Sequence, residues 1–140
     1  MISIIINSFK EPKTIGMAIE AIIHQDIEEN YELIISTPDD ETIKIAKIYQ
    51  KRNKQIKIFK DPGKGKSYAI NLLLPTLKGD ILIFTDGDVY VSENAINQVV
   101  KEFEDKNIGC VTGRPVPIET KNTQYGFWAH FLFDAAHNLR

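Results

Sequence analysis

Short apolar runs recur along the chain, and each is followed by polar residues and then by a longer stretch with helical spacing. The first run, Ile2–Ile6, is almost entirely β-branched, as a strand buried on both faces requires. Similar runs predict four more strands. The expected set is Ile2–Ile6, Leu33–Ile35, Ile56–Phe59, Ile81–Thr85 and Ile108–Thr112.

The stretches between these runs carry apolar residues three or four positions apart, which is the spacing of one helix face. Thr14 is expected to cap a helix that ends at His24, and Asp39 or Asp40 to cap the next. Three further helices are predicted over 66–77, 93–106 and 123–140. The helix over 93–106 is expected to turn five residues inward: Ala95, Ile96, Val99, Val100 and Phe103.

Strands that alternate with helices of this length indicate βαβ crossovers and therefore a mostly parallel sheet. The predicted fold class is α/β, with three layers in which helices cover both faces of the sheet. Ligands bind such folds outside the carboxyl ends of the strands. Most of the unusual polar residues fall at those ends, in Asn7–Glu11, Ser36–Asp40, Asp61–Lys66 and Thr85–Asp88.

Composition restricts the function classes. The 140 residues suit one domain, and a net charge of −2 provides no basic surface for nucleic acid. The single cysteine, Cys110, cannot form an internal disulfide and is expected to be a small core residue within the apolar run 108–111. Neither a signal peptide nor a membrane-spanning run is visible. We expect a cytoplasmic protein, or one held peripherally at the cytoplasmic face of the membrane.

The strongest motif is Asp86-Gly87-Asp88, directly after a buried strand. Two carboxylates this close repel each other, and a divalent cation such as Mn²⁺ or Mg²⁺ would supply the missing positive charge. Aspartate and glycine are also common turn residues, so an ordinary turn is the alternative. The position after a buried strand favours the metal.

A glycine- and lysine-rich loop, Gly63–Ser67, precedes the third predicted helix. The Walker pattern would need glycine at Lys60, so a P-loop ATPase is rejected. Backbone N–H groups and Lys64 or Lys66 could still lie near a diphosphate at the helix N-terminus. A solvated basic loop is an equally good explanation of this motif alone.

The order of the motifs resembles glycosyltransferase family 2. The segments concerned are SIIINSFKE, the AIIHQ helix, ELIISTPDDET, GKGKSYAIN, GDILIFTDGDV and GCVTGRP, within about the first 115 residues. The resemblance implies the nucleotide-binding half of a Rossmann-like GT-A fold. It also implies a UDP- or GDP-linked sugar donor, a divalent cation, and transfer of the sugar to an unknown acceptor with inversion.

By position, the resemblance assigns a role to each donor-binding residue. Asp86 would face the ribose, Asp88 would bind the cation that bridges the diphosphate, and Gly87 lies between them. Lys66, with Gly65 before it, would lie near the nucleotide. The remaining residues would line the base pocket: Ser8, Phe9, Glu11, Ser36, Pro38, Asp39 and Asp40.

Two departures from the family pattern matter. The family commonly has an aspartate at the end of the second strand to hold the base, where this chain has Ser36 and Thr37. Either Asp39 or Asp40 must then do that work, or base recognition is altered. The family's catalytic base lies well downstream of the Asp86 motif, and no matching motif is present here. Glu119 and Asp134 remain, and neither is favoured.

Residues 1–115 are therefore expected to form the nucleotide-sugar-binding domain, and 116–140 an amphipathic helical segment at the start of a missing acceptor-binding half. Core packing is the default explanation of its aromatic residues, with self-association or peripheral membrane contact as alternatives. Its His130, Asp134 and His137 have a helical spacing that arises often by chance, and a metal site there is not favoured.

Three hypotheses follow from the sequence. The first is the donor-binding portion of a glycosyltransferase. The second is a module that binds a nucleotide-sugar and a metal but has lost transfer. The third is a nucleotidyltransferase-like enzyme, which would need a richer glycine and basic motif after the first strand than Asn7–Pro12 provides.

Overall fold

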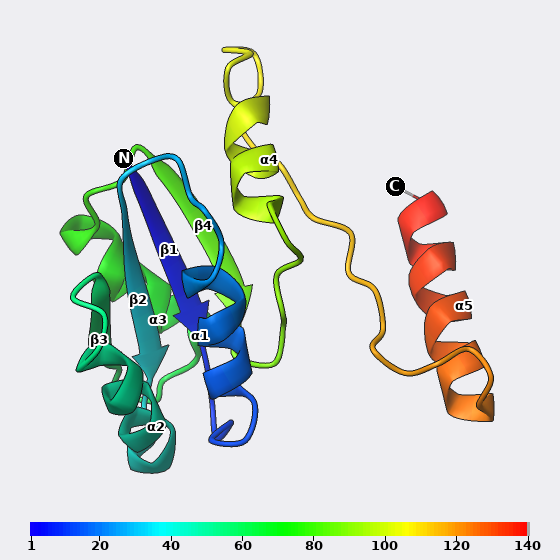
Figure 1. Ribbon diagram of the computed structural model, residues 1–140, viewed down its shortest axis with the longest axis horizontal. Coiled ribbons are helices and arrows are strands. Elements are labelled where there is room, and N and C mark those ends of the chain that lie inside the picture. The colour runs from blue at the N-terminus through cyan, green and yellow to red at the C-terminus, as the bar shows by residue number, and fades with distance from the viewer. Residues whose placement is uncertain (140) are drawn as a thin grey trace. The chain divides into compact units, whose positions relative to one another are not determined.

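The computed structural model describes residues 1–139, in which four parallel strands form one sheet in the order β3-β2-β1-β4 (Figure 1). The strands are β1 (Ile2–Asn7), β2 (Tyr31–Thr37), β3 (Ile56–Lys60) and β4 (Ile81–Asp86). The helices are α1 (Ile15–Ile23), α2 (Asp40–Gln50), α3 (Lys66–Leu73), α4 (Ala95–Glu102) and α5 (Gln124–Asn138). A short 3-10 helix, Leu74–Thr76, follows α3, where Pro75 cannot continue the α-helical hydrogen bonds.

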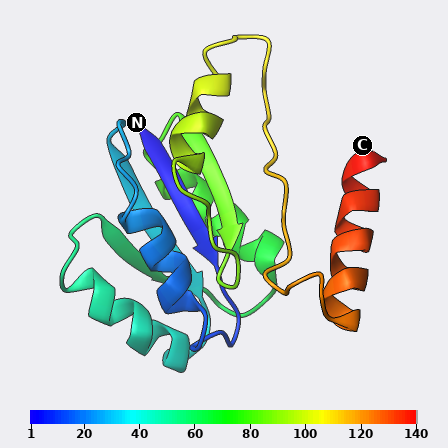
Figure 2. The same cartoon turned by 45° about the vertical axis from the view of Figure 1, so that its right-hand side comes forward.

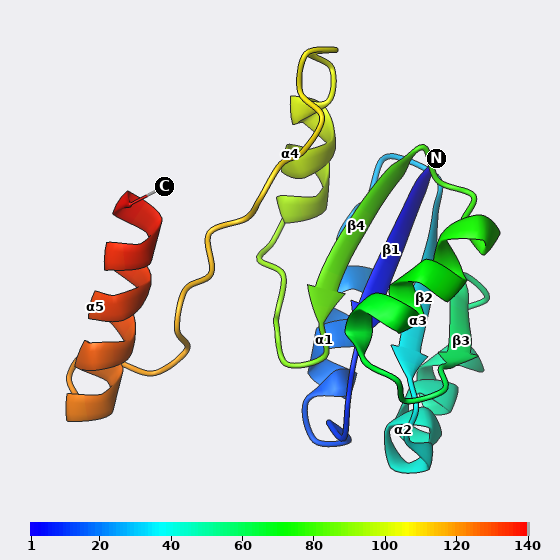
Figure 3. The same cartoon turned by 180° about the vertical axis from the view of Figure 1, so that it is seen from behind.

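Helices cover both faces of the sheet. Successive residues of a strand point to opposite sides, so the apolar strands present side chains to helices on both faces. On one face, isoleucines of β1 pack with residues of α1, α2 and α4 in the larger core cluster. Figure 2 shows α1 in front of the strands on this face. On the other face, Ile5 and Ile34 pack against Leu73 of α3, which lies in front of the sheet when seen from behind (Figure 3). The predicted three-layer α/β fold with a parallel sheet is confirmed.

The strand order changes direction beside β1. The chain passes from β1 to β2 to β3 on one side, and then returns to place β4 on the other side of β1. A crevice forms at such a reversal, because the crossovers on its two sides lie on opposite faces of the sheet. The carboxyl ends of β1 and β4, where Asn7 and Asp86 are register partners, therefore mark the expected ligand position.

The predicted fifth strand is wrong. Residues 108–112 have no regular secondary structure, and Cys110, expected in the core, is exposed. The apolar run there is short and contains Gly109, and glycine has a low preference for strands. The helix predicted over 93–106 is also shorter, since α4 ends at Glu102, and of its five expected inward residues only Ile96 is buried.

The chain separates into two compact units, Met1–Glu104 and the residues that follow. The sheet and α1–α4 belong to the first unit, and α5 belongs to the second. In the second unit, Thr123 caps α5 by accepting a hydrogen bond from the Gly126 N–H at 3.0 Å. The predicted boundary between a nucleotide-sugar-binding domain, 1–115, and a helical segment, 116–140, stays a prediction. Within residues 1–139, no helix is both long and apolar enough to cross a membrane.

Candidate functional site

A cleft of about 480 Å³ lies at the carboxyl ends of the strands. All four loops that follow the strands contribute to it, together with the start of α3. Its lining consists of Asn7, Ser8, Phe9, Glu11, Ser36, Pro38, Asp61, Gly63, Gly65, Lys66, Ala69, Asp86 and Asp88. The topology thus brings together polar residues that are up to 81 positions apart in the chain (88 minus 7).

The turn after β4 is held against the loop after β1. The Gly87 N–H donates to the carbonyl of Asn7 at 2.9 Å, and the Val89 N–H donates to the carbonyl of Asp86 at 3.1 Å. Beside this turn, the Ser8 hydroxyl donates to Glu11 Oε2 at 2.7 Å. Gly87 is buried, whereas Asp88 is exposed at the cleft. The turn therefore presents its two carboxylates from a fixed backbone.

Replacing Gly87 with alanine is expected to disturb this turn. A Cβ there would lie 2.6 Å from Ser8 Oγ and even closer to Glu11 Oε2, so both side chains would have to move. Overpacking of this kind costs about 1–3 kcal/mol. We expect this loss in urea unfolding. The matched variant is Gly109→Ala, since nothing lies within 4 Å of a Cβ at Gly109. Equal stability of the two variants would contradict the close approach.

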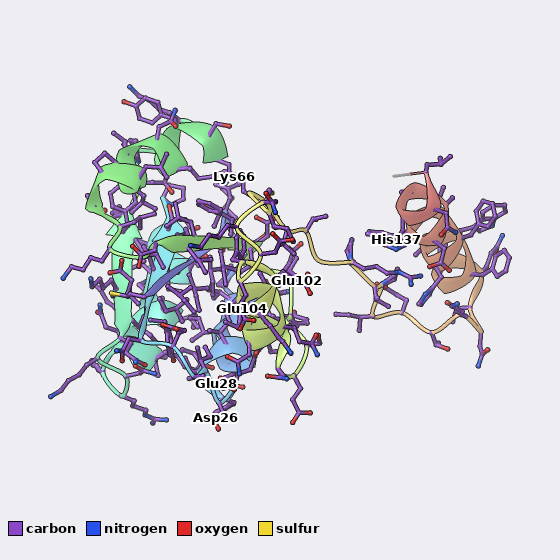
Figure 4. All side chains as sticks on the ribbon, turned by 90° about the horizontal axis from the view of Figure 1, so that it is seen from above. Asp26, Glu28, Lys66, Glu102, Glu104 and His137 are labelled. Atoms are coloured by element: carbon purple, nitrogen blue, oxygen red, sulfur yellow. The ribbon has the colours of Figure 1, made fainter. Side chains whose placement is uncertain are left out.

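Lys66 stands at the first position of α3 and forms an ion pair with Asp86. Viewed from above, Lys66 lies on the α3 side of the sheet, and Asp26 and Glu28 lie on the α1 side (Figure 4). Gly65, the residue before the helix, has a φ of +98°, which a residue with a side chain rarely adopts. The loop therefore needs glycine to place the α3 N-terminus and Lys66 at the cleft.

Charge in the cleft is unbalanced. Four carboxylates line it, on Glu11, Asp61, Asp86 and Asp88, whereas Lys66 is the only cationic side chain among the lining residues. Carboxylates that share one cleft are stabilised by a nearby positive charge. The site thus favours a ligand that arrives with positive charge, and α3 offers backbone N–H groups to an anion at its N-terminus.

Asp39 has a structural role of which the sequence predicted only one part, the cap of the following helix. Its Oδ1 accepts the Thr42 N–H at 2.9 Å and so caps α2, while its Oδ2 accepts the Lys10 N–H at 2.9 Å. Burial opposes ionisation of Asp39, but these bonds and others from the hydroxyls of Thr42 and Thr37 outweigh it. They lower its pKa from 3.8 to about 2. Asp39 therefore fixes the loop after β1 to the start of α2.

Asp39→Ala is expected to lower the free energy of unfolding by about 1–2 kcal/mol at pH 7, the usual cost of losing an N-cap. Because folding depresses the pKa of Asp39, its contribution is present above pH 3.8 and is lost as the pH falls through about 2. Urea unfolding at pH 7 and near pH 2 checks both statements. Asp40→Ala is the control, since it removes an exposed carboxylate that pairs with Lys60 but does not cap the helix. A deficit of Asp39→Ala that persists undiminished at low pH would contradict this role.

Nine of the twelve predicted donor-binding residues line the cleft. The other three do not: Asp39 caps α2, Asp40 pairs with Lys60 at 2.6 Å, and Gly87 is buried in its turn. Sequence reasoning did not single out four lining residues, Asn7, Asp61, Gly63 and Ala69. Asn7, Asp61 and Gly63 lie in the polar segments that follow predicted strands. That position after a strand is the sequence feature that could have identified them as lining residues. Ligand contact by any of these residues stays a prediction.

The oxygen donors fit a divalent cation. Asp86 and Asp88 line one cleft with Glu11, and Mg²⁺ or Mn²⁺ bound with a nucleotide needs only one or two protein carboxylates, because phosphate and water complete its shell. Across residues 1–139, no group of three or more His, Cys, Asp or Glu side chains could hold a metal. Two carboxylates at one cleft would suit a cation that shares its ligands with a bound diphosphate.

The two carboxylates considered as a catalytic base lie in the second compact unit. Asp134 forms ion pairs with Arg114 at 2.6 Å and Lys121 at 3.9 Å, and the hydrogen bond from Arg114 lowers its pKa. The backbone carbonyl of Glu119 lies 2.8 Å from His130 Nε2. A carboxylate held ionised by an arginine accepts protons poorly, so Asp134 in this state is a weak general base.

Comparisons with a family model and with a known protein point to the same family. The model of the family described as glycosyl transferase family 2 matches residues 3–137. The uncharacterized glycosyltransferase EpsJ of Bacillus subtilis (strain 168) is 26% identical over 113 residues, which are 79% of this chain and 33% of that protein.

Two solved structures share the fold. The mannosyltransferase PcManGT from Pyrobaculum calidifontis, in complex with GDP-Man and Mn²⁺, has a TM-score of 0.71 and 20% identity, covering 81% of this chain and 36% of that one. Residues 1–349 of S. aureus TarS, in complex with UDP, have a TM-score of 0.65 and 19% identity, covering 87% of this chain and 39% of that one. The chain thus spans a third of the length of EpsJ and less than two fifths of each of these two solved chains.

Proposed function

Because the chain belongs to glycosyl transferase family 2, we propose that its cleft binds a nucleotide-sugar together with a divalent cation, as the donor half of a sugar transfer. The observation that carries this proposal is the convergence of the loops after all four strands on one cleft at the β1–β4 reversal. The similar structures in complex with GDP-Man and Mn²⁺ and with UDP support the same ligand class.

In this proposal different residues of the cleft bind the diphosphate and the cation. Lys66 and the N-terminus of α3 bind the diphosphate, and Asp88, with Asp86, holds the cation. When bound, the cation neutralises the charge that develops on the departing nucleoside diphosphate. The Lys66 ammonium carries three N–H donors, so it can bond a phosphate oxygen while it keeps its ion pair with Asp86. The cleft orients the sugar for transfer to an acceptor with inversion.

A second function is favoured by one observation. Asp134, one of the two remaining base candidates, is occupied by Arg114, so these residues could form a module that binds a nucleotide-sugar without transferring it. The cytoplasmic location, with or without peripheral contact to the membrane through the aromatic residues of α5, belongs to the proposal as well. These aromatic side chains belong to the second unit, and they are exposed there, Trp128 by 52%, so that a partner could contact them.

Calorimetric titration with UDP and GDP, in the presence and absence of Mn²⁺, tests the proposal. We expect binding of at least one nucleotide that tightens with the metal. Absence of metal-dependent binding to either nucleotide would overturn the site assignment. Hydrolysis or transfer measured with UDP- and GDP-sugars then separates the enzyme from the module, since only the enzyme turns the donor over.

A further inference from the structure

A row of polar side chains crosses the carboxyl edge of the sheet on the face covered by α3. Side chains alternate along each strand, so Asn7 shares its face with Ile5, and Ser36 shares its face with Ile34. Parallel pairing places Asn7 between Ser36 on one side and Asp86 on the other. Asp61, two positions after Phe59, continues the row beyond β3, and its N–H extends the ladder to the Thr37 carbonyl at 3.3 Å.

Asp61 is the unusual member of this row. It is only 9% exposed and lines the cleft, yet no cation forms an ion pair with it anywhere in residues 1–139. Its Oδ1 accepts the Gly63 N–H at 2.8 Å, and its Oδ2 accepts only a long bond of 3.4 Å from the Ser36 hydroxyl. A carboxylate accepts about four hydrogen bonds. Asp61 therefore keeps unused acceptor capacity at the cleft.

Asn7 provides an independent indication of a ligand-binding position. It is 8% exposed and lines the same cleft, and neither its amide nitrogen nor its amide oxygen has a hydrogen-bond partner. Buried polar side chains are nearly always paired in folded proteins, with protein, water or ligand. Two polar groups of one row, each incompletely bonded, thus lie at the same place.

The chemistry of Asp61 selects the kind of ligand group. A phosphate would be repelled by the carboxylate, and a cation would need further oxygen ligands that Ser36 and Gly63 do not supply as a shell. A neutral N–H donor fits, because a carboxylate accepts it without a second charge. In a nucleotide, the base N–H groups and the ribose hydroxyls are neutral donors. Asp61 follows β3, at the opposite end of the row from Asp86, so the base, which is the part farther from the diphosphate, is the group that suits it.

The other two carboxylates near the loop after β2 already have hydrogen-bond or ion-pair partners within the protein. Asp39 accepts hydrogen bonds on both oxygens as the cap of α2, and Asp40 pairs with Lys60 outside the cleft lining. Asp61 is different, because it lies next to Ser36, and its loop contacts the loop after β2: a Cβ on Gly63 would lie 3.5 Å from the Pro38 Cβ. The carboxylate beside Ser36 in the cleft thus comes from the loop after β3 and not from the loop after β2.

Resting on the proposed function, we propose that Asp61 is the specificity-determining acceptor for the nucleobase. It accepts the ring N–H of uracil or guanine, with the Asn7 amide beside it turning to complete the remaining hydrogen bonds. Cytosine and adenine have an unprotonated acceptor nitrogen at the corresponding ring position, and that nitrogen would face the carboxylate unfavourably. The site thereby distinguishes UDP from CDP and GDP from ADP.

Asp61→Asn is the sharpest test, because asparagine keeps the Oδ1 acceptor for the Gly63 N–H and thus preserves the turn. It replaces the other oxygen with a donor. Titrations with Mn²⁺ should show wild-type preference for UDP over CDP or for GDP over ADP, and the variant should reduce that preference at least tenfold. Binding of inorganic pyrophosphate with Mn²⁺ should be unchanged, since it has no base.

The outcomes separate this inference from the proposed function. If the wild-type protein binds no nucleoside diphosphate with metal, the proposed function itself fails. If it binds UDP or GDP tightly but Asp61→Asn keeps the full base preference, only the role of Asp61 fails. A parallel loss of pyrophosphate binding would also overturn that role, because it would show that the substitution damages the whole cleft.

Discussion

Asp88→Ala is expected to remove the effect of Mn²⁺ on nucleotide binding. Asp88 is exposed at the cleft and takes part in no hydrogen bond or ion pair that supports the fold of residues 1–139, so its carboxylate is free to bind a cation. In the wild-type protein we expect Mn²⁺ to tighten UDP or GDP binding by about tenfold or more, which corresponds to about 1.4 kcal/mol. In the variant, titrations with and without Mn²⁺ should give the same Kd.

Asp80→Ala is the matched control for this experiment. Asp80 directly precedes β4, whereas Asp88 lies two residues after its end. The Asp80 side chain is 89% exposed, at the opposite end of the strand from Asp88. The control should keep the full response to Mn²⁺, and both variants should unfold at the urea concentration of the wild-type protein. A metal response that survives in Asp88→Ala would place the cation elsewhere.

Lys66→Met should weaken UDP and GDP binding by about 10–100-fold, which is the range for a lost hydrogen bond to a charged group. Lys66 is the only cationic side chain among the cleft-lining residues, against four carboxylates. Without it, the diphosphate meets an acidic surface. The same substitution leaves Asp86 without its ion-pair partner, so Mn²⁺ alone should bind no more weakly than to the wild-type protein.

Lys64→Met controls for the general loss of a positive charge. Lys64 is two residues away in the same loop, lies 5.3 Å from the centre of the Tyr68 ring and does not line the cleft. It should change the nucleotide Kd far less, and Lys66→Arg should restore part of the affinity. Equal effects of the Lys64 and Lys66 substitutions would mean that only the net charge matters, and that Lys66 makes no direct contact.

Local patterns predicted most of the sheet correctly. The apolar runs at Ile2–Ile6 and Ile81–Thr85 correspond to β1 and β4 within one residue. β1 is buried along its whole length, as its β-branched run predicts, whereas β4, which was also expected to be buried, lies at the edge of the sheet and has no fully buried residue. The run at 108–112 is also apolar, apart from Gly109, but forms no strand, since a short apolar segment does not reveal whether a neighbouring strand is available to pair with it. Pairing is a property of the folded chain.

Asp39 shows the same limit within the site. From the sequence, either it or Asp40 could have capped α2 or held a base, because both follow the strand closely. The fold assigns Asp39 to the cap and to the Lys10 N–H, and it directs Asp40 toward Lys60. Asp61 was not singled out, because its separation of 25 residues from Ser36 conceals their contact.

The sequence by itself determined the alternation of strands and helices, the parallel sheet that this alternation requires, and the position of Asp86 and Asp88 at a strand end. These follow from local periodicity and from the chirality of βαβ connections, which neighbouring residues encode. Only the tertiary structure decided which strand-end residues share one cleft, that Lys66 pairs with Asp86, and that Asp61 is buried without a cation. Those outcomes depend on contacts between distant segments, and such contacts form only when the strand order β3-β2-β1-β4 is in place.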